Sequence, residues 1–205
     1  VFMTTWSQSG AGVPGGIVAR RLNPDGTFVD AAFQVMPGDM PSIAALNGNF
    51  CIAGVRAASP QIIDLWAGRV DGATGARLDG SLGVRLGSGY FNAATRTRSD
   101  GVQWLVASHS QWTHDSSQGD AVLARVPASG APGAGFNPTP VSGGSGDLDI
   151  AFSGTKYLLV WRSNSLANAN NYVSGRIMNA DGTYATGAFV IAEAAGRQLR
   201  PTAVW

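Results

Sequence analysis

The sequence is poor in the features that several large classes of protein depend on. It contains a single cysteine, Cys51, so no disulfide can form within the chain. Charged residues make up only 13% of it, and the formal net charge is +1. A chain with so little charge offers no basic surface for nucleic acid or anionic lipid. It also has no apolar run long enough to cross a bilayer, so we expect neither nucleic-acid binding nor membrane insertion.

Side chains for catalysis and metal binding are also scarce. The only histidines are His109 and His114, and the only glutamate is Glu193. Zinc needs three or four converging ligands, which two histidines without an available cysteine do not supply. There is no G-x-S-x-G nucleophile motif, and nothing in the sequence pairs two carboxylates. From these residues alone we assign no catalytic residue, no metal and no cofactor.

A strand-rich unit is repeated along the chain. Its clearest copy spans residues 156–192, where the apolar run at 157–161 and the alternating pattern at 172–178 predict two strands. Residues 188–192 predict a third strand, and residues 150–152 predict a fourth upstream. Four short strands in about 50 residues is the size of one β-propeller blade.

Two markers recur in phase with this unit. The first strand recurs at Phe2–Trp6, Cys51–Val55, Trp104–Ser108 and Tyr157–Trp161. The second strand carries an arginine followed by a glycine turn, with the arginines at Arg20, Arg69, Arg125 and Arg176. An arginine in every unit favours a structural role, such as a bond to the turn of the neighbouring unit, over a single binding site.

The repeat predicts one all-β domain, a four-bladed β-propeller of four-stranded antiparallel blades. The predicted units are 201–205 with 1–40, 41–91, 92–147 and 148–200. The chain starts in a second strand and ends in an inner strand, so we expect the N- and C-termini to share a blade, which closes the ring and removes free sheet edges. The alternative is a fragment of a larger propeller or an open array of blades. A small residue recurs in the predicted inner strands, at Ala44, Ala94, Ala151 and Ala203, which predicts close packing around the axis.

The loops between second and third strands should gather on the same face as the links between blades. Long loops on a rigid scaffold commonly carry binding sites. In the third unit such a loop contains Trp112, whose ring suits the apolar face of a sugar, although it could also fold back over the blade. The predicted ligand-binding residues are Gln111, Trp112, His114, Asp115, Arg162, Asn164, Asn168 and Asn171.

The motifs of the fourth unit also resemble those of a known group of proteins. The strand Y-L-L-V-W at 157–161, the G-R-I pair, the N-A-D-G-T turn, the F-V-I-A strand at 189–192 and R-P-T-A at 200–203 resemble repeats of large secreted or cell-surface bacterial proteins. This resemblance covers essentially the whole chain. It implies propeller blades and a secreted or surface location, but no activity. Hemopexin-like propellers also have four blades, but their D-A-A and disulfide features do not match here.

Three functions follow from these observations. The first is a non-catalytic, lectin-like extracellular module that binds a glycan or protein on the loop face. The second is a structural subunit of a surface assembly or filament, since low charge leaves surfaces weakly repelled and makes self-association an expectation. The third is a hydrolase with its site in the central pocket, which would need two carboxylates or a histidine-based dyad.

Overall fold

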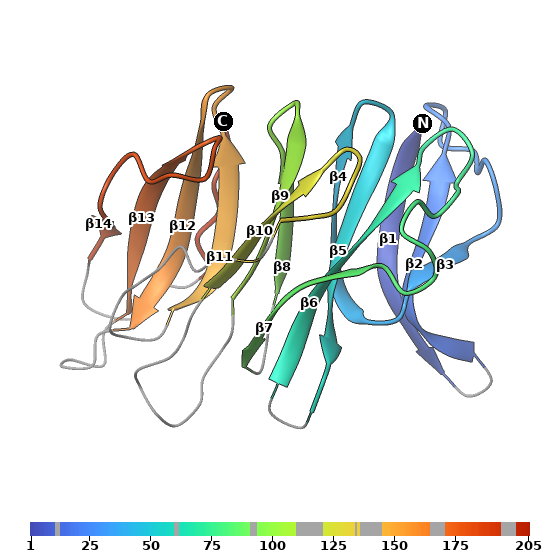
Figure 1. Ribbon diagram of the computed structural model, residues 1–205, viewed down its shortest axis with the longest axis horizontal. Helices are drawn as coiled ribbons and strands as arrows, with labels where there is room; N and C mark the ends of the chain where they lie inside the picture. Colours follow the sequence, from blue (N-terminus) through green and yellow to red (C-terminus); the bar gives the residue numbers. More distant parts are fainter. Residues whose placement is uncertain are drawn as a thin grey trace.

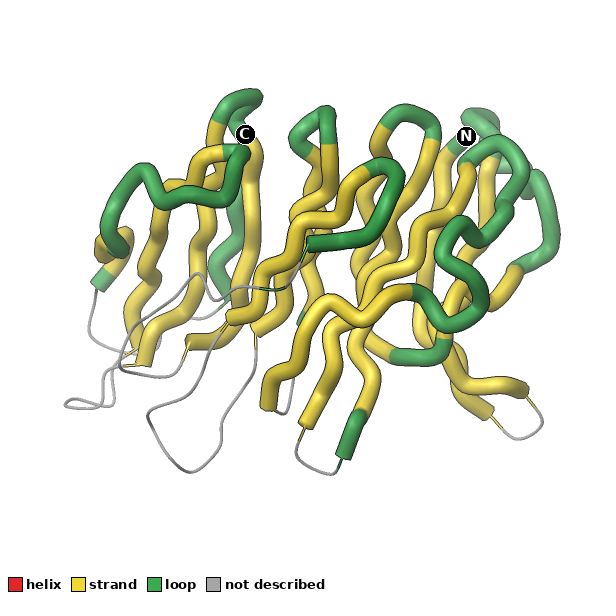
Figure 2. Tube along the Cα trace, in the orientation of Figure 1, coloured by secondary structure: helices red, strands yellow, loops and turns green. Residues whose placement is uncertain are grey.

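In the computed structural model, the described part of the chain consists of β-strands joined by turns and loops (Figures 1 and 2). The structure describes residues 1–10, 13–59, 62–90, 94–109, 121–133, 135, 145–164, 171–193 and 200–205. The strands form four antiparallel sheets that stand side by side in chain order (Figure 1). The predicted all-β fold with four blades is confirmed. No helix among the residues described is long and apolar enough to cross a membrane.

Each blade is a meander in which consecutive strands pair. Blade 1 contains β1 (Phe2–Gly10), β2 (Val13–Leu22) and β3 (Phe33–Met36). Blade 2 contains β4 (Asp39–Leu46), β5 (Asn49–Ala57), β6 (Ile62–Asp71) and β7 (Val84–Tyr90). Blade 3 contains β8 (Thr95–Ser99), β9 (Gln103–His109) and β10 (Ala121–Pro127). Blade 4 contains β11 (Ser145–Phe152), β12 (Lys156–Asn164), β13 (Asn171–Asn179) and β14 (Phe189–Ala192).

Apolar clusters fill the gaps between successive blades. Side chains alternate along each strand, so a blade has a forward flank facing the next blade and a backward flank facing the preceding one. Between blades 1 and 2 the buried set is Ile17, Ala19, Val35 and Met36 against Phe50, Ile52 and Val70. Equivalent clusters join blade 2 to blade 3 and blade 3 to blade 4. The core is therefore divided among the junctions between blades.

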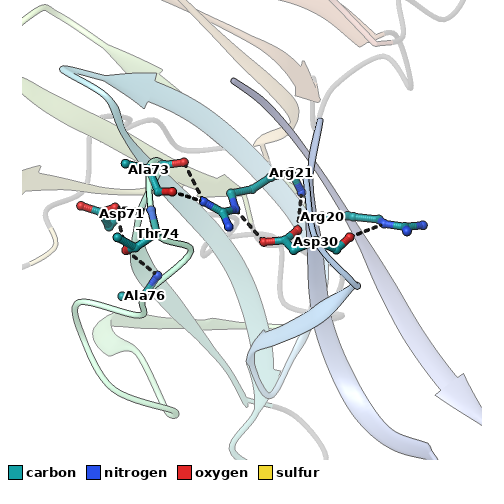
Figure 3. Close-up of polar contacts among 8 residues, drawn as sticks. Arg20, Arg21, Asp30, Asp71, Ala73, Thr74 and Ala76 are labelled. Atoms are coloured by element: carbon teal, nitrogen blue, oxygen red, sulfur yellow. Dashed lines mark hydrogen bonds and ion pairs between the residues drawn. The ribbon is translucent and has the colours of Figure 1, made fainter. Parts of the chain in front are cut away.

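A buried arginine fastens blade 1 to blade 2 (Figure 3). Arg21 lies on the forward flank of blade 1, and its Nε is 2.6 Å from Oδ2 of Asp30 in the same blade. Its Nη1 donates to the carbonyl oxygens of Gly72 and Ala73, which belong to the turn after β6 of blade 2. The ion pair holds the guanidinium in place, so the arginine acts as a rigid bridge between the blades.

The same bridge recurs at the next two junctions. Arg69 pairs with Asp79 and donates to the carbonyl oxygen of Pro127 in blade 3, at 2.9 Å. Arg125 in turn donates to the carbonyl oxygen of Asp181 in blade 4. The structural role predicted for the recurring arginines is confirmed for these two residues.

The predicted alignment of the arginines is wrong in blades 1 and 4. The bridge of blade 1 is Arg21, and the matching residue of blade 4 is Ile177. Arg20 points to the opposite flank and stacks on Phe28, with its Cζ 3.3 Å from the ring centre. Arg176 stacks on Tyr184 in the same way, at 3.4 Å. The sequence does not show which of the adjacent residues Arg20 and Arg21 makes the bridge, because only the strand register decides which flank each one faces.

The blade expected to join the two termini is not formed among the described residues. β1 pairs with β2 alone, and residues 201–205 carry no strand. The backbone N–H of Ala203 donates to Oδ2 of Asp149 at 3.0 Å, which holds this segment against blade 4. Figure 1 accordingly places the two termini in the first and last sheets of the row. Blades 1 and 3 also show three described strands where four were expected.

The inner strand of blade 3 also differs from its prediction. That strand is β8, which starts after Ala94, and it places Arg98 opposite Leu105. In blade 2 the corresponding pair is Ala44 opposite Cys51. The two pairs correspond because Cys51 is the third residue of β5 and Leu105 is the third residue of β9. An arginine therefore occupies an inner position for which a small residue was expected.

Candidate functional site at the inner strands

A cluster of charged side chains lies where the inner strands of blades 3 and 4 meet. We call Arg96, Arg98, Asp147, Asp149 and Arg162 the axial cluster. Asp149 is only 4% exposed. Its Oδ1 lies 3.3 Å from Nε of Arg96 and 3.4 Å from Nη2 of Arg98. Two guanidinium groups on one neighbouring strand thus compensate the charge of a buried carboxylate.

The alternating sequence of β8, T-R-T-R-S, explains how both arginines reach the same carboxylate. Thr95 and Thr97 are buried on one side of the strand, and Arg96 and Arg98 are partly exposed on the other. The hydroxyl of Thr97 lies 2.7 Å from that of Ser42 and fastens β8 to β4. Because the threonines fix one side of β8 against blade 2, the arginines on the other side reach β11.

Asp147 adopts a left-handed backbone conformation at the start of β11. Its φ is 47°, and the pairing of β11 with β12 shifts between Gly146 and Asp149. Met40 and Arg200, two residues before Ser42 and Thr202, have φ of 51° and 53°. A non-glycine residue in this region costs of order 1–3 kcal/mol and is typical of functional sites. The same conformation recurs two residues before Ser42, Asp149 and Thr202. It therefore belongs to the repeat, at the point where the chain enters each of these inner segments.

Arg162 completes the cluster from β12. Its Nε lies 3.6 Å from Oδ2 of Asp147, which is an ion-pair distance but too long for a hydrogen bond. That Nε is buried and has no hydrogen-bond acceptor within the described part of the chain. A buried N–H group without an acceptor is costly, so a ligand oxygen or a water bound here would be favoured.

The axial cluster combines two carboxylates with three guanidiniums. Asp147 and Asp149 are two residues apart at the start of β11, where the left-handed Asp147 interrupts the regular strand. Hydrolysis of a glycosidic bond usually needs two carboxyl groups beside that bond. The guanidiniums supply N–H donors for hydroxyl or carboxylate groups of a ligand. This arrangement offers two carboxylates and several N–H donors to a polar ligand.

Only part of the predicted site can be compared with the structure. Arg162 belongs to the axial cluster. Asn164 and Asn171 are opposite one another, where β12 and β13 are joined. Gln111, Trp112, His114, Asp115 and Asn168 lie outside the described residues, so the sugar-binding surface around Trp112 stays a prediction.

Sequence reasoning missed Arg96, Arg98 and Asp149. The available signal was charge in the predicted inner strand of blade 4, at Asp149, and directly after that of blade 3, at Arg96 and Arg98. Asp149 follows the buried Leu148 and precedes the buried Ile150, a position that an unpaired carboxylate rarely occupies. The identity of its partners depends on which strands lie side by side, and that is not visible in a single repeat.

Two cavities lie elsewhere and lack this chemistry. One of about 550 Å³ is lined by Phe33, Gln34, Gly75, Ala76, Arg77 and Gly80. The other, of about 390 Å³, is lined by Val1, Ala45, Gly48, Phe50, Gly72 and Ala73. Among the residues that the structure describes, no carboxylate lines either cavity. Across the described residues, no three or more His, Cys, Asp or Glu side chains gather as a metal site would require.

Comparisons with known proteins identify similar folds but no sequence family. No family model matches the chain, and no curated protein matches it in sequence. An α-L-arabinanase of Penicillium chrysogenum, solved with arabinobiose, matches with a TM-score of 0.66 and 12% identity over 99% of this chain and 67% of its own. An α-L-arabinofuranosidase of Fusarium graminearum, solved with an iminosugar inhibitor, matches with a TM-score of 0.57 and 12% identity over 95% of this chain and 64% of its own. The chain thus spans about two thirds of the length of these structures.

These comparisons correct the first functional expectation, a non-catalytic lectin-like module. That expectation relied on an apparent lack of paired carboxylates and on propeller repeats without an assigned activity. The solved structures named above are instead an α-L-arabinanase and an α-L-arabinofuranosidase, and the axial cluster contains two neighbouring carboxylates. At 12% identity the similarity shows the fold alone.

Proposed function

We propose that the chain is a glycoside hydrolase that acts at the axial cluster on glycans containing α-L-arabinofuranosyl residues. The observation that carries the proposal is the placement of Asp147 and Asp149 on one inner strand, each beside a guanidinium from another strand. The fold shared with the arabinanase and the arabinofuranosidase supports the substrate class. A central site of this kind was the hydrolase alternative considered for the sequence.

The two carboxylates have different surroundings, which suggests different roles. Asp149 is held by Arg96, Arg98 and the backbone N–H of Ala203, so its position is fixed. We assign it to stabilise the positive charge that develops on the sugar ring, or to attack that ring. Asp147 is the more exposed of the two, and we assign it to proton transfer.

The guanidiniums position the substrate in this proposal. Arg162 presents a buried Nε without an acceptor in the described part of the chain, and it would donate to a sugar hydroxyl. Replacing it with methionine keeps the volume and removes the donors. We expect Arg162→Met to raise KM more than it lowers kcat, since the bond is made to the bound substrate before reaction.

The proposal is tested with a panel of 4-nitrophenyl glycosides and with arabinan. We expect release from the α-L-arabinofuranoside in preference to the glucoside, galactoside and xyloside. Asp147→Asn should lower the rate at least about a hundredfold, the usual contribution of a proton-transfer group. Asp25→Asn is the matched control, because Asp25 lies in the exposed turn after β2 and bonds only within that turn. No release from any member of the panel by the folded chain, or equal rates for both variants, would refute the proposal.

A further inference from the structure

A pair of apolar side chains recurs on the backward flank of every blade. Each pair joins an aromatic residue to the aliphatic or methionine residue directly opposite on the next strand. The pairs are Phe2–Leu22, Phe50–Val70, Trp104–Val126 and Tyr157–Met178. In blades 2, 3 and 4 both members are buried against the preceding blade. In blade 1 the same position leaves Phe2 63% exposed.

The forward flank of blade 4 shows the complementary feature. Strand pairing sets Phe33 opposite Ala19 in blade 1 and Phe189 opposite Gly175 in blade 4, so the two phenylalanines correspond. Two residues after each of them, Ile191 corresponds to Val35. Val35 is buried at the junction with blade 2, in the cluster that includes Phe50. Ile191 is instead 49% exposed. This flank thus has the apolar residues of a blade junction without a blade packed on it.

We infer that these two flanks are an interaction surface at which two copies of the chain associate head to tail, with blade 4 of one copy against blade 1 of the other. The inference is independent of the proposed hydrolase activity. It extends a junction that the chain already makes three times, since Phe2 of one copy and Ile191 of the other would take the places of Phe50 and Val35, which belong to one apolar cluster within the chain. The side chains of Phe2 and Ile191 are both apolar and exposed, so their burial between two copies would favour association.

The proposed junction lacks the arginine bridge of the internal ones. Ile177 stands where Arg21, Arg69 and Arg125 make their bridges, so blade 4 offers no equivalent guanidinium to the turn of blade 1. On the other side Phe28, which pairs with Leu22, is also exposed, and the guanidinium of Arg20 lies over its ring. Association through such faces should persist at high salt, since screening weakens charge pairs but not apolar contacts.

Disulfide trapping tests the geometry directly. Phe2→Cys and Ile191→Cys are prepared as separate variants, and each keeps Cys51, which is fully buried and does not compete. We expect a cross-linked dimer when the two variants are mixed and oxidised, and none when either is oxidised alone. Dimers of Phe2→Cys alone would show a symmetric contact and overturn the inference. So would an intramolecular cross-link in a chain carrying both substitutions, which would show that its own ends meet.

Sedimentation of the unmodified chain gives a second test that needs no new cysteine. We expect the weight-average mass to rise with concentration at both low and high salt. Phe2→Asp should weaken this association at least about tenfold, equivalent to 1.4 kcal/mol. Val102→Asp is the control, because Val102 is more exposed than Phe2 but lies in the β8–β9 turn, away from both flanks. A chain that stays monomeric at all concentrations, and that gives no mixed cross-link, would rule the interface out.

Discussion

Arg69 and Asp79 form an ion pair of 2.5 Å in which both side chains are less than a tenth exposed. The carboxylate accepts from Nε and Nη2 of the guanidinium, while Nη1 donates to the carbonyl oxygen of Pro127 in the next blade. Its hydrogen bonds to Asp79 raise the pKa of Arg69. This pair links packing within blade 2 to the junction between blades 2 and 3.

Removal of this arginine should be costly. Arg69→Ala leaves the buried Asp79 carboxylate without its partner, and breaking a buried pair in this way typically costs about 3–5 kcal/mol. We expect that loss in the free energy of unfolding, measured by urea denaturation. Arg77→Ala is the comparison, because Arg77 makes an exposed bond to the carbonyl oxygen of Gln34 and should cost less than about 1 kcal/mol. Similar losses for the two variants would contradict the bridging role.

Gly72 should not tolerate a side chain. A Cβ there would lie 2.1 Å from the carbonyl oxygen of Gly48 and 2.9 Å from the ring of Phe50. The backbone N–H of Gly72 also donates to that oxygen, so the two turns cannot move apart without losing the bond. We expect Gly72→Ala to destabilise the chain by about 1–3 kcal/mol, the usual cost of forcing atoms into a packed site. Gly187→Ala is the matched control, since its Cβ would have no atom within 4 Å. Equal thermal midpoints for the two variants would show that the turns can separate.

Asp64 should contribute to sensitivity to acid. Its partial burial opposes the charged form, but the bonds that its carboxylate accepts from Arg85 and Ser88 outweigh burial and lower the pKa of Asp64. A carboxyl whose pKa is lowered by folding adds stability above its unfolded pKa of about 3.9, and that stability is lost as the pH falls through the folded value. We therefore expect Asp64→Asn to lose less stability than the unmodified chain as the pH falls below about 4. Urea unfolding over a pH series measures this, and parallel losses for both proteins would refute the assignment.

Much of the fold could be predicted from the sequence because its periodicity is local. The strand around Trp161 and its copy around Trp104 are buried runs, and both were placed correctly. The turn at Asp181 and Gly182 was visible for the same reason, since Gly182 needs a positive φ and the Asp181 carboxylate accepts from Thr183. Strands and turns of this kind depend on residues that are close together in the chain, so a single sequence is enough to predict them.

The features that could not be predicted depend on register and on which strands lie side by side. Arg20 and Arg21 are adjacent, and only the pairing of β1 with β2 shows that Arg21 faces blade 2. The role of Asp149 was not predicted, because its partners come from the inner strand of another blade. The termini were expected to meet because each seemed to lack a strand, but Ala203 instead bonds to Asp149.

The most direct test of the axial cluster as a hydrolytic site is the turnover number of Asp149→Asn. The substitution keeps the size of the side chain but removes the negative charge and one of the two accepting oxygens, so the variant can accept from the two arginines or from Ala203 but not from both. With an α-L-arabinofuranosyl oligosaccharide as substrate, and with both proteins shown to be folded by near-ultraviolet circular dichroism, we expect kcat to fall at least about a hundredfold. An unchanged kcat in the folded variant would contradict the account and would place the chemistry elsewhere on the propeller.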